Sequence, residues 1–299
     1  MSDPIADSGL VIVDKPAGMT SHDVVSRLRH AFGTRKVGHA GTLDPMATGV
    51  LVVGINRGTR FLPHLVADTK SYAATIRLGA ATTTDDAEGE VVSSSSAASV
   101  TEDQVLAAIA ALTGDIMQVP SAVSAVKIDG KRAYQRVRDG ETVEIPARPV
   151  TITRFDLLDF RPGELCDVDV EVDCSSGTYI RALARDIGQA LGCGGHLTAL
   201  RRTASGSFTL ADAQELEALM ARPGEAELSV SLDDALKRCY PVRDITEAEG
   251  TGLALGKWLG PIGLKGVHAA VTPDGKAIAL IEESGKRAAS VFVARPAGL

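Results

Sequence analysis

Aromatic residues and paired cysteines are scarce in this sequence. Phe, Trp and Tyr make up 4% of the 299 residues, so a core has to rest mainly on Val, Leu, Ile and Ala. The four cysteines form no C-x-x-C pair, which favours reduced, mostly buried thiols over a disulfide framework. The six histidines are scattered along the chain, so we expect no metal site.

Long apolar runs are also missing. The longest candidate, Gly49 to Ile55, has the length of a strand, far short of the roughly 18 residues that span a bilayer. The first residues are acidic and lack the basic start and apolar stretch of a signal peptide. We therefore expect a cytoplasmic protein with no membrane partner.

The net charge of −7 is unevenly distributed. Basic residues gather near the front of the chain and again after residue 126, while acids gather between residues 212 and 234. A local basic groove would fit a nucleic-acid partner, and a solvated basic face is the alternative for each group. The first group is Arg27, Arg29, Arg35 and Lys36, and the second is Lys127, Lys131, Arg132, Arg136 and Arg138.

The first 60 residues predict a strand, a helix and a second strand. Leu10 to Asp14 reads as a short strand that ends in a Pro–Gly turn. Ser21 can cap a helix that runs to about Phe32. A glycine-rich connection, Gly38 to Gly49, then leads into the apolar strand.

Alternating side chains predict two strands in the middle of the chain. Tyr72 to Leu78 places its apolar residues on one face, and Asp167 to Asp173 alternates strictly between valine and acid. Residues 93–99 read as a surface linker, and a capping-box pattern at Thr101 begins a helix. The charged, aperiodic stretch at about 120–150 indicates a protruding insertion.

Two further features complete the outline of the fold. An amphipathic helix begins near Ile180, with Arg181 and Arg185 off its apolar stripe. After a change in composition near Tyr240, three short strands separated by turns resemble a small β module. Their expected bounds are Val267–Val271, Ala277–Ile281 and Ala289–Val293.

Asp44 is the leading candidate for chemistry. It lies in the glycine-rich connection, where Pro45 holds it toward an extended conformation. A carboxylate presented in this way can act as a nucleophile or a general base. The alternative is an Asp–Pro turn in which the carboxylate bonds its own backbone.

Other candidates each have an ordinary reading beside a functional one. Tyr72 can pack in a core or stack on a base. Arg181 and Arg185 can be solvated helix charges or partners of a carboxylate or phosphate. His39 can fill its loop or occupy the gap left by an extruded base.

Taken in order, several segments resemble the TruB family of pseudouridine synthases. The resemblance spans residues 10 to about 210, and the block around Asp44 is its most specific part. The matching segments are Asp14–Ser21 (DKPAGMTS), Gly38–Gly49 (GHAGTLDPMATG), Tyr72, the Leu78–Gly79 step with Thr82–Gly89, Ser124–Lys127 with Gly130, Lys131 and Tyr134, Ser176–Arg181 (SGTYIR), and Leu200–Thr203 with Gly206 and Phe208.

The resemblance implies a fold and a reaction. The fold is an α+β catalytic domain, expected at residues 1–238, around a central, largely antiparallel sheet. A PUA-like RNA-binding module would follow at 239–299. In the reaction, uracil leaves C1′ of its ribose, turns and rejoins through C5, at uridine 55 in the T-loop of tRNA. This isomerisation needs no cofactor or metal.

The resemblance also implies catalytic roles. Asp44 is the nucleophile, although attack on ribose C1′, attack on uracil C6 and assistance to glycal formation all stay open. Tyr72 stacks on the flipped uracil, and Arg181 pairs with Asp44 and keeps it ionised. His39 fills the space that the base leaves.

Further residues are implied to bind the substrate. Tyr179 and Leu200 line the base pocket, and Asp86 is the acidic residue beside it. Lys15 supports the Asp44 loop or contacts RNA. The insertion at about 120–150 grips RNA and carries Lys127, Lys131 and Arg132.

One departure and three rivals remain. Val123 stands where the family often has a tyrosine, which puts that aromatic contact in doubt. A guide-RNA-dependent pseudouridine synthase shares this core, and the short tails here favour the stand-alone enzyme. A noncatalytic RNA chaperone would use the same groove. A nucleoside hydrolase would need paired carboxylates and a water path.

Overall fold

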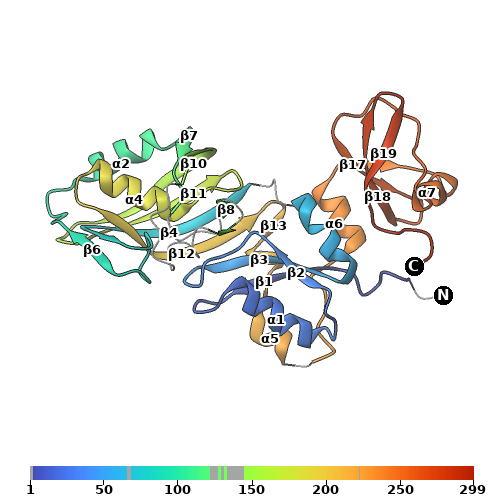
Figure 1. Cartoon of the computed structure of the whole chain (residues 1–299), viewed down its shortest axis with the longest axis horizontal. Coiled ribbons are helices and arrows are strands. Elements are labelled where there is room, and N and C mark those ends of the chain that lie inside the picture. The colour runs from blue at the N-terminus through green and yellow to red at the C-terminus, as the bar shows by residue number, and fades with distance from the viewer. Residues whose placement is uncertain (1–2, 66–68, 122–126, 129–130, 133–144, 222) are drawn as a thin grey trace. The chain divides into compact units, whose positions relative to one another are not determined.

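The computed structural model describes residues 3–65, 69–121, 127–128, 131–132, 145–221 and 223–299. Figure 1 traces the chain, which divides into two compact units. Unit 1 comprises residues 1–45, 49–66 and 205–299, and unit 2 comprises residues 46–48 and 67–204. The candidates Lys15, His39 and Asp44 therefore belong to unit 1, whereas Tyr72 and Arg181 belong to unit 2.

Unit 1 is built on two strands, β1 and β3, that pair antiparallel along their full length. On its other edge β1 pairs in parallel with β14 and antiparallel with β15, which makes the sheet mixed. All β1 residues except Asp14 are buried, as its apolar run predicts. The strands are β1 (Gly9–Lys15), β2 (Val37–Ala40), β3 (Thr48–Ile55), β13 (Phe208–Thr209), β14 (Gln214–Glu215) and β15 (Val230–Ser231).

The first helix of unit 1 uses a different cap from the expected one. Thr20, and not Ser21, is the N-cap of α1, because its hydroxyl accepts the N–H of Asp23 while the Asp23 carboxylate accepts the N–H of Thr20. Ser21 is the first helical residue. The helices of the unit are α1 (Ser21–Ala31), α5 (Leu216–Met220), α6 (Leu232–Cys239), α7 (Glu247–Ala254), and the 3₁₀ turns η1 (Asn56–Arg60), η2 (Leu62–Leu65) and η3 (Leu210–Asp212).

The end of the chain forms a small β module with its own core. Four strands run in the order β16-β17-β18-β19, of which β16–β17 is parallel and the other pairs are antiparallel. Three of them confirm the late strands expected from the turns between them. The strands are β16 (Val242–Asp244), β17 (Val267–Val271), β18 (Ala277–Ser284) and β19 (Arg287–Val293).

Besides the module's own core, an apolar cluster includes residues of both this module and the first strand of unit 1. Leu10 and Ile12 of β1 share a core with Ala269, Leu280 and Phe292 of the module. The Arg57 guanidinium also donates to the carbonyls of Ala294 and Val293. Three of the aromatic residues meet here, since the Phe61 ring contacts those of Tyr240 and Phe292.

Unit 2 is a sheet with helices on one face. Its strands run in the order β12-β4-β11-β10-β7, and β4–β11, β11–β10 and β10–β7 are antiparallel. Helix α2 packs against β10 and α4, and α4 packs against β4 (Figure 1). The elements are β4 (Lys70–Leu78), β5 (Ala80–Thr82), β6 (Val91–Ser94), α2 (Glu102–Ala111), β7 (Gly114–Gln118), β8 (Lys127–Ile128), β9 (Lys131–Arg132), β10 (Arg148–Arg161), β11 (Cys166–Cys174), α4 (Ile180–Ala190) and β12 (Gly195–Ser205).

The two faces of β11 confirm the predicted alternation. Val168, Val170 and Val172 are buried, while the acids between them lie on the other face and pair with arginines of neighbouring strands. Arg77 of β4, for example, forms a two-bond ion pair with Asp167 at 2.7 and 2.8 Å. The expected α+β fold with a large mixed sheet and a small C-terminal β module is confirmed.

The linker expected at residues 93–99 is partly wrong. Residues 93–94 belong to β6, which pairs with β5. Ala97 is fully buried, and its N–H donates to the Glu164 carbonyl at 3.0 Å. A low-complexity sequence can still fill a core position when the residue is as small as alanine.

No helix in the described part of the chain is long and apolar enough to cross a membrane.

Candidate active site

The Asp44 loop connects β2 to β3. The glycine-rich connection is shorter than expected, because Val37–Ala40 is a strand that pairs with β3. Asp44 is half-buried in the remaining loop. Gly41 and Gly49, on either side of it, have φ of 72° and 98°, a region that residues with a Cβ rarely adopt.

The main chain on both sides of Asp44 is held from the segment Asp14–Ser21. Before it, the Leu43 N–H donates to the Ser21 hydroxyl at 2.9 Å, and that hydroxyl donates to the Leu43 carbonyl at 3.1 Å. After it, the Pro45 carbonyl accepts the Gly18 N–H at 2.9 Å. Sequence alone gave no sign of the Ser21–Leu43 contact, because the two residues are 22 positions apart.

Lys15 is fully buried beneath this loop. Its ammonium donates to the carbonyls of Pro16, Met19 and Pro45 at 2.9, 2.7 and 3.3 Å. Three oxygen partners offset the cost of removing an ammonium from water. Lys15 thus ties the turn after β1 to the residue that follows Asp44.

Unit 2 holds the candidates for a base pocket. Tyr72 lies on the buried face of β4, opposite Val172 of β11. Leu200 is buried in β12. Tyr179 is half-buried and directly precedes α4.

Arg181 and Asp86 meet as a buried ion pair within unit 2. Their side chains are 5% and 3% exposed, with 3.3 Å between Nη1 of Arg181 and Oδ2 of Asp86. The same nitrogen donates to the Thr84 carbonyl at 2.8 Å. Arg181 was expected off the apolar stripe of its helix, and it is buried all the same because Asp86 supplies the opposite charge.

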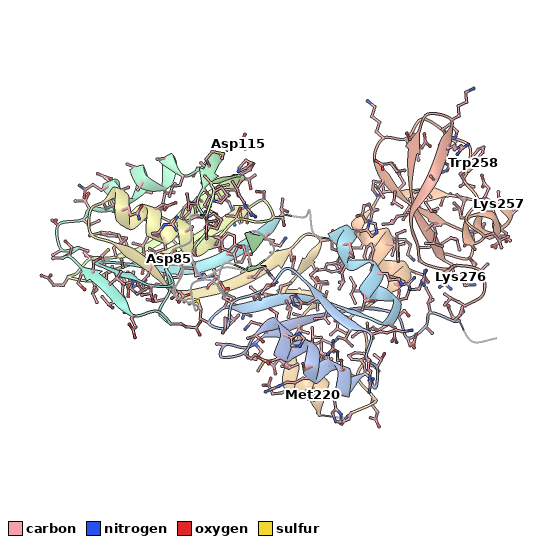
Figure 2. The ribbon with its side chains drawn as sticks, viewed as in Figure 1. Asp85, Asp115, Met220, Lys257, Trp258 and Lys276 are labelled. Carbon is pink, nitrogen blue, oxygen red and sulfur yellow. The ribbon has the colours of Figure 1, made fainter. Side chains whose placement is uncertain are left out.

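Arg185 holds the same loop one helical turn later. Its guanidinium lies 3.4 Å from Asp85, which is labelled in Figure 2, and bonds Asp186 on its own helix. Burial raises the pKa of the Asp186 carboxyl, an effect that the charge of Arg185 opposes. Asp85 has φ of 60°, so this ion pair helps to hold an uncommon backbone conformation.

The remaining candidates are only partly described. His39 lies in β2, half-buried. In the insertion, the backbones of Lys127–Ile128 and Lys131–Arg132 pair as β8 and β9, and the side chains of Lys127, Lys131 and Arg132 lie outside the described part. So do residues 122–126, 129–130 and 133–144, including Val123.

Comparison with known proteins identifies the family. The model described as TruB family pseudouridylate synthase (N terminal domain) matches residues 29–180. Two further models, tRNA pseudouridylate synthase B C-terminal domain and tRNA Pseudouridine synthase II, C terminal, match residues 181–239 and 240–295.

Relatives and a solved structure agree with these models. The chain is 70% identical over 297 residues to tRNA pseudouridine synthase B of Corynebacterium glutamicum strain R, covering 99% of each chain. It is 58% identical to the protein of that name from Nocardia farcinica, over 99% of this chain and 96% of that one. The crystal structure of the archaeal box H/ACA sRNP Nop10-Cbf5 complex matches with a TM-score of 0.73 and 25% identity, covering 98% of this chain and 88% of that one. With these matches over its whole length, the chain belongs to the TruB family of tRNA pseudouridine synthases and is an enzyme that forms pseudouridine.

Proposed function

We propose that this enzyme isomerises uridine 55 in the T-loop of tRNA, with Asp44 as nucleophile and without a cofactor. The tRNA substrate agrees with the names of the relatives. The T-loop position and the catalytic roles rest on the motifs that resemble the family, above all Gly38–Gly49. The reaction is a rearrangement in which C1′ of the ribose exchanges its bond to uracil N1 for a bond to C5, while C5 loses its proton and N1 gains one.

The observation that carries this proposal is the support of the Asp44 loop. Ser21 bonds both main-chain atoms of Leu43, while Gly18 and Lys15 bond the carbonyl of Pro45. A nucleophile gains most when it is held close to its attack position before substrate arrives. Both neighbours of Asp44 are anchored in this way, which an ordinary Asp–Pro turn does not require.

The unit 2 residues supply the surroundings of the base in this proposal. Tyr72 stacks on the flipped uracil, and Tyr179 and Leu200 line its pocket. Arg181, with Asp86 beside it, offers the charge that keeps the Asp44 carboxyl ionised. A base pulled from its stack costs a few kcal/mol, which a stacking partner offsets.

Binding to tRNA depends on basic groups outside this pocket. Arg27, Arg29, Arg35 and Lys36 are all exposed on unit 1, and phosphate contacts of this kind position RNA without reading its sequence. We assign a second grip to the insertion with Lys127, Lys131 and Arg132. In this scheme residues 1–238 form the catalytic domain, residues 239–299 form a PUA-like RNA-binding module, and His39 fills the gap left by the base. The enzyme works in the cytoplasm.

The test is Asp44→Asn on unmodified tRNA transcripts, with pseudouridine mapped by position. Wild type is expected to modify one T-loop uridine without added metal or nucleotide. Asp44→Asn is expected to lose at least about a thousandfold in single-turnover rate while tRNA binding stays within about twofold, because the nucleophile is removed and the loop keeps its shape. Asp103→Asn, on the exposed first turn of α2, is the matched control.

Other outcomes separate the rivals. Isomerisation by Asp44→Asn at a rate close to that of wild type would reject the assigned nucleophile. Release of free uracil would support a hydrolase, and modification only after a guide RNA is added would support the guide-dependent class. Binding to tRNA by a wild-type protein that forms no pseudouridine would support a chaperone.

A further inference from the structure

A buried glutamine holds the start of helix α4. Gln118, the last residue of β7, is only 2% exposed. Its Oε1 accepts the Tyr179 N–H at 2.8 Å, and its Nε2 donates to the Tyr179 carbonyl at 3.1 Å. One carboxamide therefore bonds both polar main-chain atoms of one residue, as a neighbouring strand would.

This contact lies at the N-terminus of α4, where no side chain of the N-cap residue caps the helix. Tyr179 is the N-cap residue of α4, and tyrosine lacks the short side-chain oxygen with which Ser, Thr, Asp or Asn caps a helix. The Tyr179 carbonyl also accepts the N–H groups of Ala182 and Leu183, which form the first turn. Gln118, which lies outside the helix, thus fixes the position of the Tyr179 main chain on which the first turn is built.

The first turn of α4 carries two proposed pocket residues. Tyr179 precedes the turn, and Arg181 extends from it to the Thr84 carbonyl and the Asp86 carboxylate. A shift of the Tyr179 peptide would move the tyrosine ring and the base of the arginine side chain together. Because Arg181 follows Tyr179 by only two residues, no loop between them can absorb this shift.

Helix α4 contacts the end of β7 at a second point. The Arg185 guanidinium donates to the carbonyl of Val119 at 2.8 Å, one residue after Gln118. Gln118 itself pairs with Arg148 of β10, which ties this end of β7 to the sheet. Two successive turns of α4 are therefore fastened to the same short stretch of chain.

We propose that Gln118 is a positioning residue for the isomerisation, which acts by fixing the Tyr179 peptide and, through it, the placement of Tyr179 and Arg181. The inference rests on the proposed function, because it takes these two residues as part of the uridine pocket. Gln118 acts through Tyr179 and has no contact with substrate in this scheme.

The experiment compares Gln118→Met with Gln189→Met in the full-length enzyme. Methionine keeps the length of glutamine and loses both hydrogen bonds, and Gln189 is exposed at the other end of α4. Gln118→Met is expected to lower the single-turnover rate at saturating enzyme by about tenfold or more, since small misplacements cost this much. Its Kd for unmodified tRNA should stay within about twofold, and Gln189→Met should match wild type in both.

A milder variant covers the case in which Gln118→Met does not fold. Gln118→Asn keeps the amide and shortens its reach by one methylene, so a folded protein with a smaller loss of rate, about three- to tenfold, is expected. Hydrogen exchange should be faster at the start of α4 in either variant and unchanged in Gln189→Met.

The outcomes separate this inference from the proposed function. If Asp44→Asn is inactive and both folded Gln118 variants keep wild-type rates, the positioning role is wrong and the proposed function stands. A rate loss accompanied by an equal loss of tRNA affinity would also overturn it, because that result indicates a binding defect. If Asp44→Asn stays active, the proposed function itself fails.

Discussion

The loop that carries Asp44 and the helix that carries Arg181 are held by different kinds of bond. In unit 1, Lys15 and Ser21 reach main-chain atoms of Leu43 and Pro45, the two neighbours of Asp44. In unit 2, Arg181 reaches a carboxylate, that of Asp86, as well as a carbonyl. The first arrangement fixes a path of the backbone, and the second balances one buried charge against another.

The difference has consequences for mutation. A main-chain anchor works through geometry, so losing its donor leaves carbonyl oxygens unsatisfied while the charge of the catalytic residue is unaltered. A buried ion pair works through charge, so removing one partner leaves the other uncompensated, and removing both can cost little. Substitutions in the main-chain anchors and in the buried ion pair are therefore expected to change stability and activity in different proportions.

The largest effect is expected from Arg181→Met. It leaves the buried Asp86 carboxylate without its opposite charge, so the free energy of unfolding should fall by about 3–5 kcal/mol. Activity should fall at least about a hundredfold, because the pocket loses a proposed catalytic charge. Chemical denaturation and single-turnover assays measure the two quantities.

A double substitution sharpens this expectation. Arg181→Met with Asp86→Leu removes both charges and should recover most of the lost stability without recovering activity. Recovery of the reaction by the double variant would mean that Arg181 serves only to neutralise Asp86.

A smaller effect is expected from Lys15→Met. Three carbonyls lose a charged donor, and we expect a loss of about 2–3 kcal/mol in the free energy of unfolding. The rate should fall by about tenfold to a hundredfold with tRNA affinity little changed, because the Asp44 loop loses an anchor. Lys237→Met, in a partly exposed ion pair with Asp234 on α6 of the same unit, is the control for charge. A Lys15→Met enzyme that is less stable and equally fast would show that the loop keeps its position without this residue.

The smallest effect is expected from Arg77→Thr, which removes an ion pair on the outer face of β4. Arg77 and Asp167 are partly exposed, and pairs of this kind contribute about 1 kcal/mol or less. The nearby carboxylate remains solvated, so neither stability nor rate should change much in thermal melting and activity assays. If Arg77→Thr lowered the free energy of unfolding as much as Arg181→Met, the burial of an ion pair would not be what decides how much stability its loss removes.

The strands were predictable where neighbouring residues decide them. Alternation of valine and acid fixes the faces of β11, and the apolar run of Leu10–Val13 fixes β1. Turn residues between the last strands placed β17, β18 and β19. These signals depend on periods of two residues and on turn chemistry, which a single sequence displays.

The contacts that build the site depend on residues far apart in the chain. Lys15 and Pro45, 30 positions apart, meet only because β1 and β3 pair in register. Gln118 meets Tyr179 across 61 positions through the packing of α4 beside the sheet. Ser21 shows how such contacts mislead a local reading, because a residue well suited to cap a helix bonds Leu43 instead. Resemblance to a family could name Asp44 and suggest Lys15 as a support of its loop, but it could not name the contacts of Ser21 or Gln118.

The apolar cluster shared by β1 and the last strands bears on how this enzyme can be shortened or recombined. Leu10 and Ile12 belong to one apolar cluster with Ala269, Leu280 and Phe292, and helix α6 packs against both β1 and β18. A chain truncated after α6 would expose the face of α6 that packs against β18, and it would strip Arg57 of the carbonyls that it binds. The terminal segment therefore cannot be exchanged for an unrelated one, as a tethered appendage could, unless the exposed face of α6 and the Arg57 site are redesigned with it.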